Sequence, residues 1–214
     1  MITLLVKAEI GSDAVEAQYY ANLTGEPYLY FELKQVAKLS LAGLSPVEIR
    51  AKIKDENLFQ SATNKSIDKL LRATLKRVAI LDEVMLNILV NGSLHTSKLV
   101  TLIAIVKTNR LFWEFIEEVY MEKVQLGEQE LEPKDFRIFF NNKAEQSSKV
   151  AGWQEYTLKK LSAVYSRILF EAGLINNTHQ KTLTPPTIEE ELLNHLRKLG
   201  DHRLIRAITG GRMS

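Results

Sequence analysis

Residues 64–81, NKSIDKLLRATLKRVAIL, sort their charged and apolar side chains onto opposite sides of one predicted helix. Lys65, Lys69, Arg72 and Lys76 are four, three and four residues apart. At about 100° per residue, these cations fall within roughly 60° of one another. The far side collects apolar side chains: Ile67, Leu70, Leu71, Leu75, Val78 and Leu81. Such a helix has one face for a core and one for an anion, although any exposed helix of a soluble bundle has the same pattern.

The residues before this stretch predict two shorter helices. A stripe of apolar residues indicates a helix over 31–41, which Gly43 ends. The sequence SPVE at 45–48 has the form of a capping box with proline at the first helical position. A second helix therefore begins at Pro46.

The order of these helices is typical of a helix-turn-helix domain over residues 31–81, in which the last helix enters the DNA major groove. Ser61 or Thr63 can cap the basic helix. The connector 56–62 is longer than the usual tight turn, so the match is imperfect.

The charge of the chain is segregated along its length. Its 214 residues carry a net charge of only +2, and 45% of them are hydrophobic, enough for one elongated domain or two small ones. Residues 63–81 hold five cations and one acid, residues 113–135 hold eight acids and two cations, and residues 195–214 hold five cations and one acid. Separate basic segments around an acidic middle suit a protein that presents particular faces to a polyanion.

The rest of the chain also has helical spacing, so we expect a mainly all-α protein. Its two predicted helical lobes, 1–92 and 93–214, are joined through the acidic middle at 113–135. Met1 to Leu23 is ambiguous, with strand-like alternation at 2–6 and a helical pattern from residue 14. Later helices are expected over 84–91, from Thr96 or Ser97 to 106, and over 111–124, 133–140, 153–172, 188–199 and 201–208.

Two features of the second lobe predict local structure. Thr187 with Glu190 has the form of another capping box, and Asp201 can cap the last basic helix. Residues 174–183 read either as a small hairpin, like the wing of a winged helix, or as a plain helix end at Gly173. The aromatic cluster at 136–140 is more typical of a core than of a base-stacking platform, because it lies beside the acidic segment.

The sequence lacks the patterns of the common catalytic and metal sites. It has no cysteine, no HExxH pair, no P-loop and no GxSxG elbow, and its four histidines show no metal-ligand spacing. We therefore expect no enzyme, no metal, no cofactor and no small-molecule substrate. No apolar run approaches the roughly 20 residues needed to cross a bilayer, and no signal peptide is recognisable, so a cytoplasmic protein without a membrane partner is expected.

Several motifs occur in the order typical of one family. Phe31-Glu32 precedes a short helix, followed by GLSPVEI and a connector with Asn57, Leu58 and Ser61, and then by LLRATLKRV, FWEFIEEVY, DFRIFF, WQEYTLKKL and ILFEAGLI. From about Tyr28 to Pro185 the chain resembles BrxA, a component of the BREX bacterial phage-defence systems. These motifs are mostly core and cap residues, so the resemblance indicates the fold more firmly than a site.

The resemblance implies a small, all-helical cytoplasmic protein, similar in fold to the NusB transcription antitermination factor, that serves phage defence by binding double-stranded DNA. Arg72 and Arg77 match the basic positions of the family's LLRATLKRV-like segment. The assignments of Lys65, Lys69 and the C-terminal arginines rest on helix geometry alone.

Together these observations predict a non-catalytic protein that binds double-stranded DNA mainly through phosphates and assembles with other BREX subunits. Asn64 and Ser66 are expected at base edges, because a recognition helix usually reads with its N-terminal residues. The phosphate contacts are assigned to Lys65, Lys69, Arg72, Lys76, Arg77, Lys159, Lys160, Arg167, Arg203 and Arg206. Two alternatives stay open: a scaffold whose acidic region 114–132 docks on a basic partner, and an RNA-binding protein like the antitermination factor.

Overall fold

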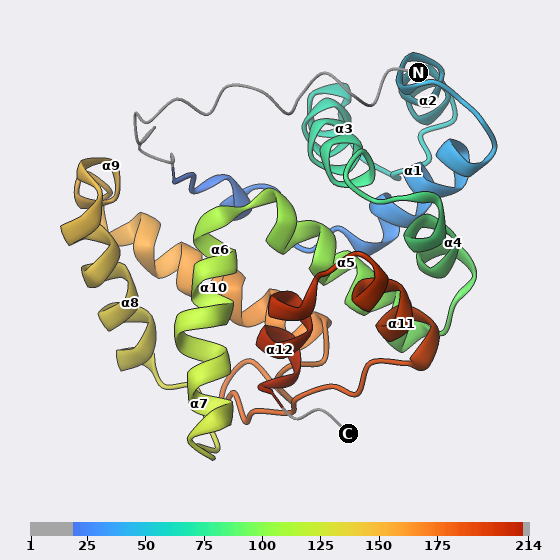
Figure 1. Cartoon of the computed structure of the whole chain (residues 1–214). Helices are drawn as coiled ribbons and strands as arrows, with labels where there is room; N and C mark the ends of the chain where they lie inside the picture. The colour runs from blue at the N-terminus through green and yellow to red at the C-terminus, as the bar shows by residue number, and fades with distance from the viewer. Residues whose placement is uncertain (1–18, 212–214) are drawn as a thin grey trace, which may run out of the picture.

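The computed structural model describes residues 19–211, whose regular structure is helical (Figure 1). The all-α prediction is confirmed. The predicted strand at 2–6 and the start of the ambiguous helix at residue 14 lie outside the described residues. The elements are η1 (Asn22–Thr24), α1 (Tyr30–Leu41), α2 (Pro46–Asp55), α3 (Asn64–Val78), α4 (Glu83–Asn91), α5 (Leu94–Thr108), α6 (Arg110–Phe115), η2 (Ile116–Met121), α7 (Glu122–Gln125), α8 (Pro133–Gln146), α9 (Ser148–Ala151), α10 (Glu155–Glu171), α11 (Glu190–Lys198) and α12 (His202–Thr209).

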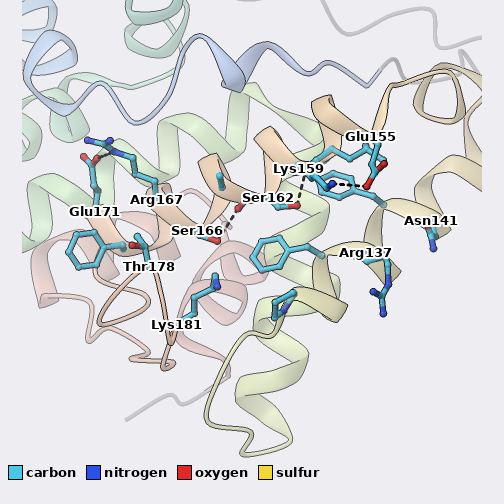
Figure 2. A pocket seen from close by; sticks show the side chains of 16 residues that line it. Arg137, Asn141, Glu155, Lys159, Ser162, Ser166, Arg167, Glu171, Thr178 and Lys181 are labelled. Atoms are coloured by element: carbon cyan, nitrogen blue, oxygen red, sulfur yellow. Dashed lines mark hydrogen bonds and ion pairs between the residues drawn. The ribbon is translucent and has the colours of Figure 1, made fainter.

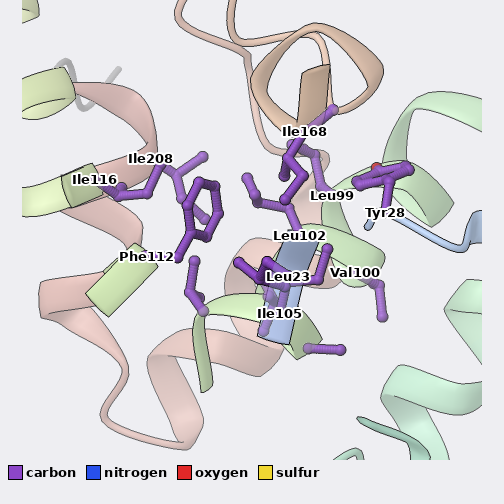
Figure 3. Packing of buried hydrophobic residues seen from close by; sticks show 14 of the residues in the cluster. Leu23, Tyr28, Leu99, Val100, Leu102, Ile105, Phe112, Ile116, Ile168 and Ile208 are labelled. Carbon is purple, nitrogen blue, oxygen red and sulfur yellow. The ribbon is translucent and has the colours of Figure 1, made fainter. Parts of the chain in front are cut away.

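Helix α5 is the centre of the molecule. Every residue from Leu99 to Val106 is buried, so this helix is covered on all sides, as expected of a core helix without a polar face. It packs against α1, α3 and α4 on one side and continues through Asn109 into α6 on the other. Figure 3 shows α5 side chains between Tyr28 on one side and Phe112 and Ile208 on the other.

Helices α1, α2 and α3 pack against one another, and α2 and α3 begin at caps that the sequence predicts. Ser45 accepts a hydrogen bond from the Glu48 backbone while the Glu48 carboxylate accepts one from the Ser45 backbone, so the capping box is confirmed. Thr63 Oγ1 accepts from the Ser66 backbone and caps α3. The cap positions therefore fix where the basic helix starts.

An aromatic cluster packs α6, α8 and α10 together. Phe115 stacks on Phe136 of α8 with ring centroids 4.9 Å apart, and its ring lies 5.2 Å from that of Tyr165 on α10. Phe112 meets Tyr165 edge to face at 4.8 Å. Such pairs are worth about 1 kcal/mol each beyond their buried area. The predicted core role of the aromatic residues at 136–140 thus fits Phe136, Phe139 and Phe140, whereas Ile138 is 53% exposed.

Tyr165 carries a hydroxyl that is buried without a hydrogen-bond partner among the described residues, and burial raises its pKa well above the ordinary value. An unsatisfied buried polar group costs about 1–3 kcal/mol. We therefore expect Tyr165→Phe to leave the free energy of unfolding unchanged or to raise it by about 1 kcal/mol, as measured by urea unfolding. A loss of more than about 1 kcal/mol in the free energy of unfolding would mean that the hydroxyl makes a hydrogen bond.

Several predicted helix starts are wrong. Helix α5 begins at Leu94 with Ser93 as its cap, and Thr96 and Ser97 are buried inside it. The box predicted from Thr187 and Glu190 does not form: the helix starts at Glu190, and the preceding Glu189 accepts a hydrogen bond from Ser93 instead.

Asp201 makes no capping hydrogen bond to α12; its carboxylate pairs with Lys107 at 2.5 Å. Helix α8 runs on to Gln146, beyond the predicted end at residue 140.

Residues 174–183, which the sequence reads either as a small hairpin or as a plain helix end, form a hairpin. Ile175 and Leu183 make an antiparallel bridge, and Thr182 makes a second one with Glu130. The arm at 181–183 is therefore held between two neighbouring segments. A wing that reaches away from the protein would need a free arm, so this hairpin does not have the form of an extended wing.

The division of the chain at residue 92 stays a prediction. Helix α4 lies before that point and α5 after it, and the two pack together, as do α4 and α11. The buried apolar side chains of both parts belong to one hydrophobic cluster.

Candidate nucleic-acid interface

The exposed side of α3 carries the cations that the sequence places there. Lys65, Lys69, Arg72 and Lys76 are all exposed, whereas Ile67 is only 2% exposed on the opposite side. No carboxylate of the described part of the chain lies within 4.0 Å of any of these four. Four neighbouring positive charges are therefore left for an external anion.

The N-terminal end of α3 is exposed and has no acidic residue in its first turn. Asn64 and Ser66 lie at this end, and both are exposed. The positive end of the helix dipole adds to the attraction for an anion at this point.

Asp68 is the one acid on α3, and its charge is matched by cations of α2. Its carboxylate lies 2.7 Å from Lys54 Nζ and 3.5 Å from Arg50 Nη1. The hydrogen bond from Lys54 lowers the pKa of Asp68 below its ordinary value, so Asp68 stays ionised and paired at neutral pH. It therefore subtracts little from the potential in front of α3.

Lys76 connects the α3 face to a cavity of about 660 Å³ that Lys107, Arg110 and Arg203 also line. Its ammonium donates to the Thr108 carbonyl at 3.2 Å. The structure thus brings together Lys76 and Arg203, which are 127 positions apart in the sequence.

Unlike the α3 cations, three residues of this cavity already have acidic partners. Lys107 pairs with Asp201, Arg110 pairs with Glu114 at 2.6 Å, and Arg203 Nη2 donates to Glu117 at 2.7 Å. No sequence pattern points to Lys107 or Arg110. They lie near Lys76 because α3 packs on α5, and no local sequence pattern predicts that packing.

Arg77 is a correction to the predicted site. It is 3% exposed, and its guanidinium donates to the carbonyls of Tyr28 at 3.1 Å and Glu26 at 2.7 Å. Burial lowers its pKa to about 10, so it remains charged at neutral pH while it fastens the loop before α1 to α3. A group used in this way cannot reach a phosphate.

Leucine substitutions at Arg77 and Arg72 compare the effect on stability of a buried and an exposed arginine of the same helix. Arg77→Leu leaves two inward carbonyls without their donor, so we expect a loss of about 3 kcal/mol in the free energy of unfolding. Arg72→Leu should stay within about 0.5 kcal/mol, because its side chain is exposed. Urea unfolding of both variants checks this, and equal stability would refute the structural role of Arg77.

The remaining predicted residues lie elsewhere. Lys159 and Arg167 line a different cavity, between α8 and α10, and each pairs with an acid four residues away, Glu155 and Glu171 (Figure 2). Lys160 is exposed but is not part of that cavity's lining.

Arg206 is exposed at a third cavity, which His202 and Gln125 also line. The structure therefore does not unite these cations with α3 into one surface.

Within residues 19–211, no group of three or more histidine or acidic side chains is arranged to hold a metal ion. No helix of the same residues is long and apolar enough to span a membrane.

Comparison with known proteins identifies relatives over nearly the whole chain. The model of the family described as BrxA matches residues 17–200. A protein of Bacillus cereus (strain H3081.97) named BREX protein BrxA is 39% identical over 187 residues, which cover 87% of this chain and 94% of the relative. A protein of the same name from Paramagnetospirillum magneticum (strain ATCC 700264 / AMB-1) is 22% identical and covers 90% of this chain and 97% of the relative.

A solved structure has the same fold. The crystal structure of an uncharacterized protein from Magnetospirillum magneticum superposes with a TM-score of 0.77 at 23% sequence identity, over 90% of this chain and 98% of that one. At that identity the likeness concerns the fold alone.

Proposed function

The chain belongs to the BrxA family, and from this premise we propose that it is a non-catalytic, double-stranded DNA-binding subunit of a BREX phage-defence system. The single observation that carries the DNA proposal is the exposed face of α3, whose four cations have no acidic partner within residues 19–211. Other BREX subunits are its expected protein partners. The predicted division into lobes is part of this proposal, with residues 1–92 presenting α3 to DNA.

The proposed contact is mainly to phosphates. Lys65, Lys69, Arg72 and Lys76 extend over about 16 Å of helix at 1.5 Å per residue, so they can follow a strand along the edge of a groove. Each neutralised phosphate releases counterions, which drives binding but carries no sequence information. Asn64 and Ser66, at the exposed start of the helix, are the proposed base-edge contacts, so we expect weak sequence preference.

Duplex DNA fits this surface better than duplex RNA does. The B-DNA major groove is about 12 Å wide and admits an α-helix, whereas the major groove of A-form RNA is deep and narrow. An exposed helical flank such as that of α3 matches the first groove. This favours DNA over the RNA-binding alternative.

The scaffold alternative has less support from the acidic segment. Glu114 and Glu118 pair with Lys143, and Glu117 pairs with Arg203. Acids that already have internal partners attract a basic protein less strongly.

Fluorescence anisotropy with a labelled 20-base-pair duplex tests the proposal. We expect saturable binding at low salt that weakens as salt rises, and an unlabelled duplex should compete better than an RNA hairpin of equal length. Absence of binding, salt-independent binding or preferential competition by RNA would contradict it.

A further inference from the structure

A groove between α8 and α10 lies apart from the α3 face. It encloses about 1030 Å³, and its lining includes Phe136 and Phe140 from α8 with Leu158, Ala163 and Phe170 from α10. From Glu155 to Glu171 the α10 side runs for about 24 Å at 1.5 Å per residue. None of the residues assigned to α3 contributes to it.

The accessible apolar surface of the floor comes from Leu158, Ala163 and Phe170 of α10. Ser162 and Ser166 lie in the middle of the groove in Figure 2, but their hydroxyls donate to carbonyls of their own helix, Leu158 and Ser162, both at 2.9 Å. Ala163 leaves space beside them. A second helix can approach closely over such small side chains.

The rim of the groove is positive. Arg137 of α8, Lys159 and Arg167 of α10 and Lys181 of the hairpin surround the floor (Figure 2). Among the described residues, the lining has two acids, Glu155 and Glu171. Each is joined to a cation four residues away, Lys159 or Arg167, and such exposed pairs are worth little and exchange easily. Arg137 and Lys181 have no carboxylate partner in the part of the chain that the structure describes.

We propose that this groove binds an amphipathic helix of a partner protein, with its apolar stripe on the floor and acidic residues flanking that stripe against the rim. A helix of about 15 residues has the length of the α10 side. Charge complementarity with the four rim cations selects an acidic over a basic partner.

Single-stranded nucleic acid is the less favoured occupant. Base stacking needs exposed ring faces, but Phe136 and Phe140 are 3% and 2% exposed. The Phe136 ring already stacks on Phe115, and the Phe140 ring lies against Phe139 and Tyr165. Only Phe170, at 45% exposure, shows much of its ring.

Two designed peptides test the proposal directly. The first is a labelled 15-residue helical peptide with leucines at i, i+3, i+4 and i+7 and glutamates flanking them, and the second has lysine at every glutamate position. By anisotropy, we expect the acidic peptide to bind the full chain at least about tenfold more tightly than the basic one.

Matched variants locate the binding. Ala163→Glu places bulk and negative charge on the floor and should weaken the acidic peptide at least about tenfold, whereas Lys160→Glu, outside the lining on the same helix, should change it little. Lys181→Gly removes a rim cation at a position with φ of 53°, which glycine adopts freely, and should weaken binding without loss of stability.

Three results would overturn the proposal: no binding of the acidic peptide, equal binding of the basic peptide, or equal effects of Ala163→Glu and Lys160→Glu. Binding of a 12-nucleotide oligo-dT that Ala163→Glu abolishes, without peptide binding, would assign the groove to single-stranded nucleic acid instead. Duplex DNA binding by α3 is measured separately, so each proposal can fail without the other.

Discussion

Replacing Lys69, Arg72 and Lys76 by glutamate is expected to lower the affinity for duplex DNA at least about 100-fold. All three side chains are exposed, and none has an acidic partner among the described residues, so their charges are available to phosphates. The variant loses three attractions and gains three repulsions at the same place. Fluorescence anisotropy at constant salt measures the change.

A second triple variant controls for net charge. Lys134, Lys149 and Lys198 are exposed and lie outside α3, and their replacement by glutamate changes the net charge of the chain by the same amount. We expect less than about a tenfold loss from this variant. Equal losses in the two variants would show that the chain attracts DNA by its overall charge and not through α3.

Replacing Lys143 by methionine should cause the largest loss of stability among single substitutions at charged residues. Lys143 is 2% exposed, and its ammonium lies 2.7 Å from Glu114 and 2.6 Å from Glu118. The substitution takes from the largely buried Glu114 carboxylate the more buried of its two cations and leaves it only Arg110, which we expect to cost about 3–5 kcal/mol. Urea unfolding at pH 7 measures the loss.

Two companion variants identify the cause. Glu118 is 48% exposed, so Glu118→Gln should cost less than about 1 kcal/mol. Adding Glu114→Gln to Lys143→Met removes the buried charge that has lost one of its two cations and should recover part of the lost stability. If the two single substitutions lowered the free energy of unfolding independently, their losses would add up in the double variant. Additive losses would show that Lys143 and Glu114 are not coupled.

The same pair predicts how stability depends on pH. Burial raises the pKa of Glu114, but hydrogen bonds from Lys143, Tyr19 and Arg110 outweigh it, so the pKa lies below its ordinary value. Burial lowers the pKa of Lys143, but its bonds to Glu114 and Glu118 outweigh this and raise the pKa. Glu114 contributes to the free energy of unfolding above its unfolded pKa of about 4.3, and this contribution is lost as pH falls through its folded pKa. Lys143 contributes below its unfolded pKa of about 10.4, and this contribution is lost as pH rises through its folded pKa. The stability gap between the natural chain and Lys143→Met should therefore narrow below about pH 4.

Local signals predicted much of the first half of the fold. The pairs Ser45 with Glu48 and Thr63 with Ser66 lie within three residues, so the sequence contains both members of each cap. The capping box expected from Thr187 and Glu190 was wrong: His95 contacts the Thr187 carbonyl and Ser93 donates to the Glu189 carboxylate, so a distant segment holds the residues before the helix. Caps can be read from sequence only where no partner from another element competes.

Arg77, which was predicted to contact phosphate, and Lys143, for which no role was predicted, show the same limit in different ways. Arg77 lies about 120° from Lys65 around the helix, so the periodicity itself separated it from the cation face, although its two carbonyl partners were not visible in the sequence. Lys143 follows Phe136 by seven residues and Phe139 by four, on the buried side of α8. Its burial depends on Glu114 and Glu118, which arrive from another helix.

The salt dependence of DNA binding by the natural chain and by a variant with Lys69, Arg72 and Lys76 replaced by alanine tests the role of α3 most directly. Each lost phosphate contact should lower the steepness of log affinity against log salt by about 0.9. Three contacts predict a slope that is shallower by between about 2 and 3 in the variant. Two parallel lines would contradict the assignment of the DNA contact to this helix.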